Sequence, residues 1–463
     1  MSEDWNWTET RPGHWERHVD HIEDYFVTIA DLTRPVGGDH FSTSFGAQIK
    51  FQPEKALGEI ESALKQAWTA LRFDLPQLAS IVEDRRMIYE SLPDDSTRQE
   101  WLSRTVVIDT SSNSSAELFP RLNQSPKQAM LYYLPKSSEV VIHTAHWRLD
   151  GYGATLLLSQ LLQHVVELPT STITFGSEPA RLYPSHFVLL KAPENPPESS
   201  QKITDQSIFD YITHLPSIQI PSVTGPTPKL VPTTHRQEIT INQQQTADLV
   251  ASAKARGVSL TVVAHAAMIR ATKAMNPDIT LDESAKYACI VPVSIRDLLP
   301  TPYDGPAYAA SVAMTGVPVG FTSTTFDKDM DRLQDLYHNE LKHPSRIEGL
   351  RAFQNKMTES LKQPPVVDIP TPTHPTLNSL GLIERYLKPS YYGKDGDVKV
   401  DKFWVGTGVV DHTVWVYIWT WKEQLTISAT YNTGMYDDHT IRDFLGRFSE
   451  VLTQKLIPTA STS

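Results

Sequence analysis

The sequence predicts an α/β protein built from two halves, and three observations lead to this prediction. The chain has 463 residues, 40% of them hydrophobic and 21% charged, which describes a globular protein longer than one hydrophobic core usually supports. Segments with helical periodicity alternate with short runs of strand-forming residues. A polar, proline-rich stretch separates two parts of similar outline. We therefore predict an N-terminal domain (1–191), an interdomain linker (192–234) and a C-terminal domain (235–463).

The N-terminal half contains two segments with helical periodicity and three runs of strand-forming residues. Helices are predicted at 54–74 and 154–166, and the second of these is apolar enough to be mostly buried. Strands are predicted at 105–109, 129–134 and 139–147.

The C-terminal half follows the same pattern, with strands concentrated in its last quarter. Helices are predicted at 244–255, 259–275, 330–361 and from Asp437 or Asp438 to Leu452. Strands are predicted at 235–241, 287–293, 403–410, 413–421 and 425–431. In the strand 413–421, aromatic residues share one face and aliphatic residues the other. Both of its faces are therefore expected to be covered by protein.

Composition excludes several classes of function. The formal net charge of −12 and the absence of a cationic stripe disfavour nucleic-acid binding. No apolar run approaches the roughly 20 residues that span a bilayer, and the acidic N-terminus lacks the layout of a secretory signal. The single cysteine, Cys289, lies in an apolar run that predicts a buried thiol. We expect a soluble, cytoplasmic monomer.

One short segment carries most of the chemical information. It reads His146-Trp147-Arg148-Leu149-Asp150-Gly151. A predicted strand ends at His146 and an apolar helix follows Gly151, so the imidazole is expected at a strand end, where α/β proteins form clefts. A histidine with an ordinary pKa near 6.5 can accept and return a proton near neutral pH. Asp150 would orient the imidazole or fix the loop, and Gly151 would let the chain bend.

The segment from His146 to Gly151 has two other interpretations. His146 could be a strand-end histidine bonded to backbone, with Asp150 serving only as a helix N-cap. A metal site formed by His143, His146 and Asp150 is disfavoured, because strand residues three apart point to opposite faces. No metal is therefore expected.

With these residues, the chain resembles the His-x-x-x-Asp acyltransferase superfamily, which includes plant BAHD acyltransferases, peptide-synthetase condensation domains and fungal O-acetyltransferases. The resemblance covers most of the chain and is strongest to the fungal trichothecene 15-O-acetyltransferase group. The segments that carry it, besides the motif, are 67–72, 244–275, 292–296, 378–381 and the aromatic strands at the C-terminus.

The resemblance implies two chloramphenicol-acetyltransferase-like subdomains, each a mixed β-sheet flanked by helices, with His146 in a tunnel between them. It implies acetyl-CoA, or another acyl-CoA, as cosubstrate and a small-molecule alcohol as acceptor. It also implies that Asp150 pairs with an arginine of the second domain, for which Arg296 is the candidate; an ordinary surface position for Arg296 is the alternative. Arg148 could meet a coenzyme phosphate or solvent.

The sequence departs from the family patterns at two informative places. Condensation domains usually carry two adjacent histidines where this chain has Ala145-His146, which disfavours carrier-linked amide synthesis. The chain also lacks the Asp-Phe-Gly-Trp-Gly segment of the plant enzymes, so no motif identifies the oxyanion donor. Asn378 and Ser379 are candidates for that role or for binding the acceptor, with a simple turn as the alternative. For the acceptor pocket the candidates are Trp404, Trp415, Trp419 and Tyr431, with core packing as the alternative for each.

The predicted function is CoA-dependent O-acyl transfer, most simply O-acetyl transfer, to a hydroxyl of a fungal secondary metabolite such as a terpenoid or polyketide. His146 would act as general base, without an acyl-enzyme, since no Gly-x-Ser-x-Gly elbow is present. One alternative is a repurposed enzyme that uses the same histidine for cyclisation or condensation without CoA. Another is a non-catalytic binding protein that retains the motif.

Overall fold

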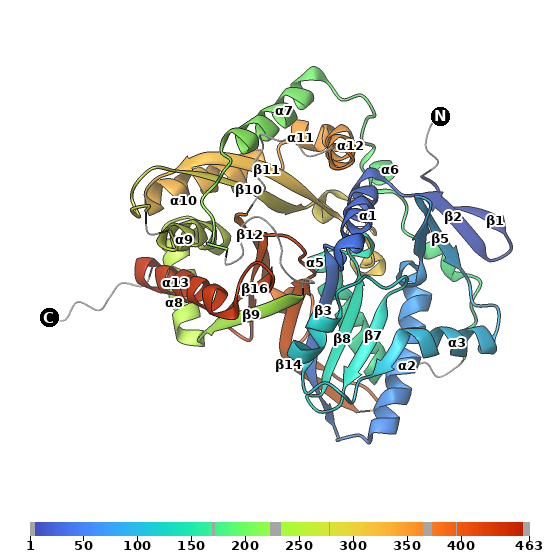
Figure 1. The fold of residues 1–463 in the computed structure, drawn as a ribbon. Coiled ribbons are helices and arrows are strands. Elements are labelled where there is room, and N and C mark those ends of the chain that lie inside the picture. The colour runs from blue at the N-terminus through green and yellow to red at the C-terminus, as the bar shows by residue number, and fades with distance from the viewer. Residues whose placement is uncertain are drawn as a thin grey trace.

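The computed structural model describes residues 5–168, 172–222, 233–276, 278–363, 373–394 and 396–456. The chain folds into two large mixed sheets that lie side by side, with a long two-stranded ribbon above them (Figure 1). Among the described residues, no helix combines the length and the apolar character needed to cross a membrane.

The first large sheet has six strands in the order β13-β14-β3-β8-β7-β6. Its strands are β3 (Ser42–Gln52), β6 (Val106–Ile108), β7 (Met130–Leu134), β8 (Glu139–Ala145), β13 (Ser390–Tyr391) and β14 (Asp397–Thr407). The helices α2 (Leu57–Asp74) and α5 (Gly151–Val166) share one hydrophobic cluster with this sheet. These helices and the strands β6, β7 and β8 confirm the elements predicted for the N-terminal half.

The second large sheet has four strands in the order β12-β15-β16-β9. Its strands are β9 (Thr234–Ile241), β12 (Pro375–Leu382), β15 (Val414–Trp421) and β16 (Gln424–Asn432). The helices α8 (Gln243–Ala255), α9 (Leu260–Ala274) and α13 (Asp438–Leu456) share a hydrophobic cluster with this sheet. The aliphatic face of β15 belongs to that cluster, while its aromatic face joins the cluster of the six-stranded sheet. Both faces are thus covered, as predicted.

A ribbon of two long strands, β10 (Ala285–Ser294) and β11 (Met314–Ser323), completes the second half. The region predicted to be helical at 330–361 is interrupted, because α10 (Phe326–Asp335), α11 (Pro344–Glu348) and α12 (Leu350–Leu361) are separate helices. A π-helical turn, Leu336–Glu340, follows α10 directly. Such turns occur often at functional sites.

Several elements had no counterpart in the prediction. A four-stranded sheet is formed by β1 (Thr8–Arg11), β2 (His14–His18), β4 (Ile81–Glu83) and β5 (Arg86–Glu90). The further helices are α1 (His21–Thr33), α3 (Asp95–Thr105), α4 (Ser115–Leu118), α6 (His186–Leu190) and α7 (Glu198–Thr213). The stretch predicted as a linker therefore contains a helix of four turns, and its residues 223–232 lie outside the described part of the chain.

The chain crosses between the two sheets near its end. β14 pairs antiparallel with β3, whereas the next strand, β15, pairs with β12 and β16. Strands from the end of the chain therefore complete the sheet that carries His146.

Candidate active site

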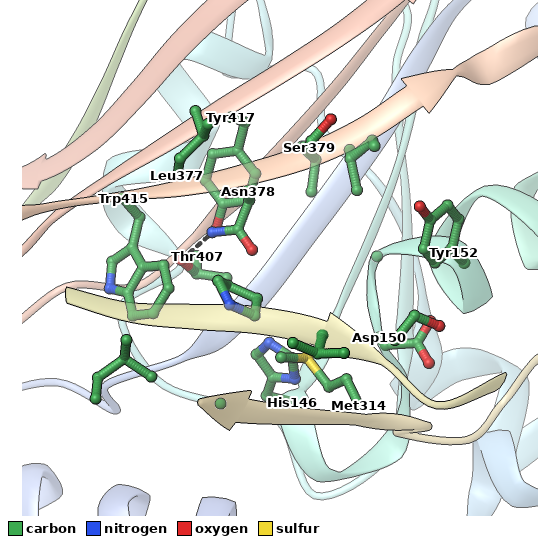
Figure 2. Close-up of a pocket in the computed structure, with 18 of the residues that line it drawn as sticks. His146, Asp150, Tyr152, Met314, Leu377, Asn378, Ser379, Thr407, Trp415 and Tyr417 are labelled. Atoms are coloured by element: carbon green, nitrogen blue, oxygen red, sulfur yellow. Dashed lines mark hydrogen bonds between the residues drawn. The ribbon is translucent and has the colours of Figure 1, made fainter. Parts of the chain in front are cut away.

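His146 follows the last residue of β8, a strand buried along its whole length. Its half-buried ring faces a cavity of about 400 Å³. Residues from α1, β3 and the start of α5 form one side of this cavity, and residues from α9, β10, β11 and β12 form another. The cavity therefore lies between the two halves of the chain, with His146 at its wall (Figure 2).

Two phenylalanine rings hold the imidazole. Phe26 of α1 stacks on His146 with ring centroids 4.3 Å apart and an angle of 5° between the planes. Phe41 meets the imidazole with its edge, at 5.8 Å and 83°. These contacts restrict the ring to one orientation in an apolar setting.

Burial lowers the pKa of His146 to about 4, while its own backbone carbonyl and the Asp150 carboxylate act in the opposite direction. Its Nδ1 is buried and forms no hydrogen bond with any other described residue. Because the pKa lies below neutrality, the ring is uncharged at pH 7 and one ring nitrogen is free to accept a proton.

Asp150 is fully occupied by hydrogen bonds from other parts of the chain. It caps α5 by accepting from the Gly153 amide at 2.6 Å, and it accepts from the Ala313 amide at 2.8 Å. Its Oδ2 also lies 2.9 Å from Arg296 Nη2, so the expected pair is present, and both side chains are buried. The Arg296 guanidinium in turn donates to the Ser311 carbonyl at 3.0 Å. This arrangement fixes the turn after His146 to the connection between β10 and β11.

Gly151 and Gly153, which follow Asp150, lie close to other segments of the chain. A Cβ on Gly151 would lie 2.7 Å from Leu380 Cδ2 of β12, and neither Gly151 nor Gly153 has a positive φ. A Cβ on Gly153 would lie 2.3 Å from the Ala309 carbonyl oxygen, a backbone atom that cannot move aside cheaply. Close packing against backbone therefore requires glycine at 153, whereas the neighbour of Gly151 is the end of a flexible side chain. The bend suggested for Gly151 from the sequence stays a prediction.

Asn378 and Ser379 lie in strand β12, which excludes the simple turn considered above. Both line the cavity (Figure 2). The register of β12 against β15 shifts between Ser379 and Gly381, an irregularity that often accompanies active sites. Ser379 Oγ is 2.8 Å from Thr261 Oγ1, while the Asn378 side chain forms no hydrogen bond with another described residue. Asn378 therefore has donors available toward the cavity.

Of the four aromatic residues predicted for the acceptor pocket, Trp415 alone lines the cavity. Trp404 packs against Phe119 at 5.8 Å, and Trp419 is buried beside Phe403. Tyr431 is bonded to Asp438 at the start of the last helix. These three belong to hydrophobic clusters instead, which was the alternative for each of them. Trp404 lies in a cluster with Leu118 and Phe119, Trp419 in the cluster of the six-stranded sheet and Tyr431 in that of the four-stranded sheet.

Arg148 lies away from the cavity and from solvent. The sequence had suggested that it meets either a coenzyme phosphate or solvent, and neither is the case. Its side chain is 1% exposed and donates to the backbone carbonyls of Ser80 and Lys127 at 2.7 and 2.8 Å. Burial lowers the pKa of Arg148 to about 9. Its role is to join the motif turn to neighbouring loops.

Sequence reasoning missed the residues that shape the pocket around His146, especially Phe26 and Phe41. A signal for α1 was present: Asp20 and Glu23 form a capping box immediately before the apolar residues of this helix. Asp20, Glu23 and His186 also form the one group of potential metal ligands among the described residues. Arg17 already pairs with Glu23 there at 2.6 Å, which supplies the positive charge.

Several known proteins are similar to this chain in sequence. A family model described as the C-terminus of phthiocerol/phthiodiolone dimycocerosyl transferase matches residues 231–330. The acetyltransferase pigO of Monascus ruber is 27% identical over 457 residues, covering 97% of this chain and 98% of that protein. The O-acetyltransferase pigM of the same fungus is 26% identical over 464 residues, covering 97% of this chain and 87% of that protein.

A solved structure shares the fold at lower sequence identity. The TRI3 trichothecene 15-O-acetyltransferase of Fusarium sporotrichioides is 15% identical, covers 97% of this chain and 98% of its own, and superposes with a TM-score of 0.81. The predicted fold class is therefore confirmed. The curated relatives confirm the predicted class of enzyme, an acyltransferase.

Proposed function

We propose that this chain, which belongs to the His-x-x-x-Asp acyltransferase superfamily, transfers an acetyl group from acetyl-CoA to a hydroxyl of a small secondary metabolite. The observation that carries the proposal is the uncharged His146 ring facing a cavity between the two halves of the chain. A proton acceptor in a site that holds both substrates is the main requirement of direct acyl transfer.

The reaction proceeds in two steps in this proposal. His146 removes the proton of the acceptor hydroxyl as the oxygen attacks the thioester carbonyl, which gives a tetrahedral intermediate. The intermediate then collapses, the carbon–sulfur bond breaks, and the His146 imidazolium returns its proton to the departing thiolate. No acyl group is attached to the protein.

Asn378 is the proposed donor to the oxyanion of the intermediate. Its amide lies on the cavity wall and makes no competing hydrogen bond with the rest of the described chain. A donor fixed by a strand needs no reorganisation when charge develops on the oxygen. Ser379, whose hydroxyl is already bonded to Thr261, is instead assigned to positioning.

Asp150 and Arg296 are proposed to position the catalytic turn. Because every carboxylate oxygen of Asp150 is engaged by the chain itself, this residue holds His146 in place and takes no proton during the reaction.

The class of acceptor follows from the cavity lining. Phe26, Phe41 and Trp415 contribute aromatic carbon to the wall. The hydroxyls of Thr43 and Thr407 are bonded within the chain, to the Phe41 carbonyl and the Tyr417 hydroxyl. Such a surface suits a largely apolar acceptor with few polar groups. The relatives that are named acetyltransferases support the acetyl group as the acyl substituent.

The test uses purified protein with acetyl-CoA and a panel of terpenoid and polyketide alcohols. We expect free thiol to appear only when an alcohol is present, together with a product heavier by one acetyl group. A product formed equally well without acetyl-CoA would establish the CoA-independent alternative. Absence of turnover with every alcohol and every acyl-CoA would contradict the proposal.

A further inference from the structure

A second, smaller cavity adjoins the active-site cavity. It holds about 30 Å³. The residues that line both cavities, and so separate them, are Tyr25, Phe26, Ile290, Met314 and Gly316. The smaller cavity is enclosed on its other sides by residues of α1, β11 and α12, namely Ile22, Thr315, Phe353, Gln354 and Met357.

The smaller cavity is chemically apolar. Ile22 and Phe353 are 1% and 7% exposed, and their side chains contribute only carbon atoms. Thr315, Gln354 and Tyr25 are the polar residues of its wall, and the Gln354 amide nitrogen donates to the Thr315 hydroxyl. The other side chains of the wall are hydrocarbon or thioether, so the space suits the end of a hydrocarbon chain.

Met314 is the movable part of the shared wall. Phe26 is fixed by its stack on His146, and the Tyr25 ring packs against Phe26 with centroids 5.4 Å apart. Ile290 is β-branched, and Gly316 has no side chain. Met314 is half-buried and has an unbranched, adaptable side chain, while its backbone is held by pairing with Ser294 of β10. Met314 and His146 line the same cavity (Figure 2).

We propose that the smaller cavity is a side pocket for a hydrocarbon chain attached next to the reacting centre, and that Met314 sets the length of chain the enzyme accepts. A chain that leaves the reacting carbon near His146 meets Met314 first and enters the side pocket only if that side chain gives way. The proposal rests on the acyl transfer proposed above. The chain belongs either to the acyl group or to the acceptor, since both bring apolar carbon to this point.

Two arms of one experiment distinguish these sources. In the first, one accepted alcohol is combined with straight-chain acyl-CoA thioesters from acetyl to octanoyl. In the second, acetyl-CoA is combined with alcohols that differ in the length of an alkyl substituent beside the hydroxyl. Turnover of acetyl-CoA by the wild-type chain is measured first, so that failure of the proposed function is recognised separately.

Four variants are compared in both arms, namely Met314→Ala, Met314→Val, Met357→Ala and Met314→Ala/Met357→Ala. Met357 lines only the smaller cavity, which makes its single variant the matched control. Thermal melting identifies any variant that fails to fold, and Met314→Val, which keeps more of the wall, then replaces Met314→Ala.

We expect Met314→Ala to raise kcat/KM for longer chains relative to the shortest one by roughly tenfold or more in one arm. Met357→Ala alone should leave the preference unchanged, because Met314 still closes the entrance, and the double variant should accept a longer chain than either single one. The arm that responds identifies the chain. Folded Met314 variants with the wild-type length preference in both arms would overturn the proposal.

Discussion

His146 lies between the face of Phe26 and the edge of Phe41, and this surrounding determines its acid–base behaviour. An exposed histidine would lose half of its basic form near pH 6.5. Burial lowers the pKa of His146 to about 4, so the neutral form persists well into the acidic range. The stretch of sequence around the motif contains neither phenylalanine, which is why this property could not be predicted from it.

The lowered pKa of His146 determines how the activity should depend on pH. Because the pKa of the base is lowered, kcat/KM should stay constant as the pH falls through 6.5 and should decline only toward about pH 4. The measurement is the pH dependence of kcat/KM with one alcohol, with circular dichroism at each pH to show that the protein remains folded. An acidic limb centred on 6.5 would mean that the base is not the His146 ring packed between Phe26 and Phe41.

The buried ion pair of Asp150 and Arg296 can be tested by removing the charge of Asp150. Asp150→Asn leaves the buried Arg296 without its counter-charge, and loss of one partner from a buried pair costs roughly 3–5 kcal/mol. Activity and melting temperature should therefore fall together. Asp443→Asn, which removes an exposed carboxylate paired with Arg447, is the control and should change neither. A stable Asp150→Asn protein without activity would instead indicate a direct chemical role.

Helices with a regular spacing of apolar residues could be predicted from the sequence. The pairing of strands that lie far apart in the sequence could not. α2, α5, α8 and α9 were predicted from apolar spacing and caps, because each buries one continuous face. β14 was predicted as a strand, but its partner β3 lies more than 300 residues away in the sequence, and no local signal encodes that pairing. Which aromatic side chains reach the cavity depends on how the sheets pack, so Trp415 could not be distinguished from Trp404, Trp419 and Tyr431 by sequence alone.

Gly153, near the start of α5, lies close to the Ala309 carbonyl, and a substitution can test this contact. Gly153→Ala places a methyl group against the Ala309 carbonyl and the Asp150–Arg296 pair. We expect a loss of stability of roughly 1–3 kcal/mol from overpacking, with loss of activity, measured by denaturant unfolding and thiol release. Gly58→Ala, an exposed glycine of α2 with open space around it, is the control and should be neutral or slightly stabilising. Equal effects of the two substitutions would contradict this account of the turn.

At the scale of the whole molecule, the two halves are linked by shared strands and by a buried ion pair. The division at 1–191, 192–234 and 235–463 stays a prediction. β13 and β14 complete the first sheet although they come from the far end of the sequence. The cavity could be anticipated only through the family resemblance, since its walls come from segments scattered over the chain.

Because β14 comes from the end of the sequence and pairs with β3, a fragment that contains only the first half should lack a strand of its sheet. A protein consisting of residues 1–234 lacks β14, so β3 would present an unpaired, largely buried strand as a new sheet edge. We expect that fragment to aggregate or to remain unfolded, whereas the full chain stays in solution; size-exclusion chromatography and circular dichroism measure this. A monomeric fragment with a cooperative thermal transition would show that the first half folds without the strands from the C-terminus.

The role of His146 is tested most directly by measuring kcat/KM of His146→Ala with one accepted alcohol and acetyl-CoA, with and without added imidazole. We expect kcat/KM to fall by about 10²- to 10⁴-fold without a change in melting temperature, and to recover in part when imidazole enters the vacated space. A His146→Ala protein that turns over as fast as the wild-type chain would contradict the account.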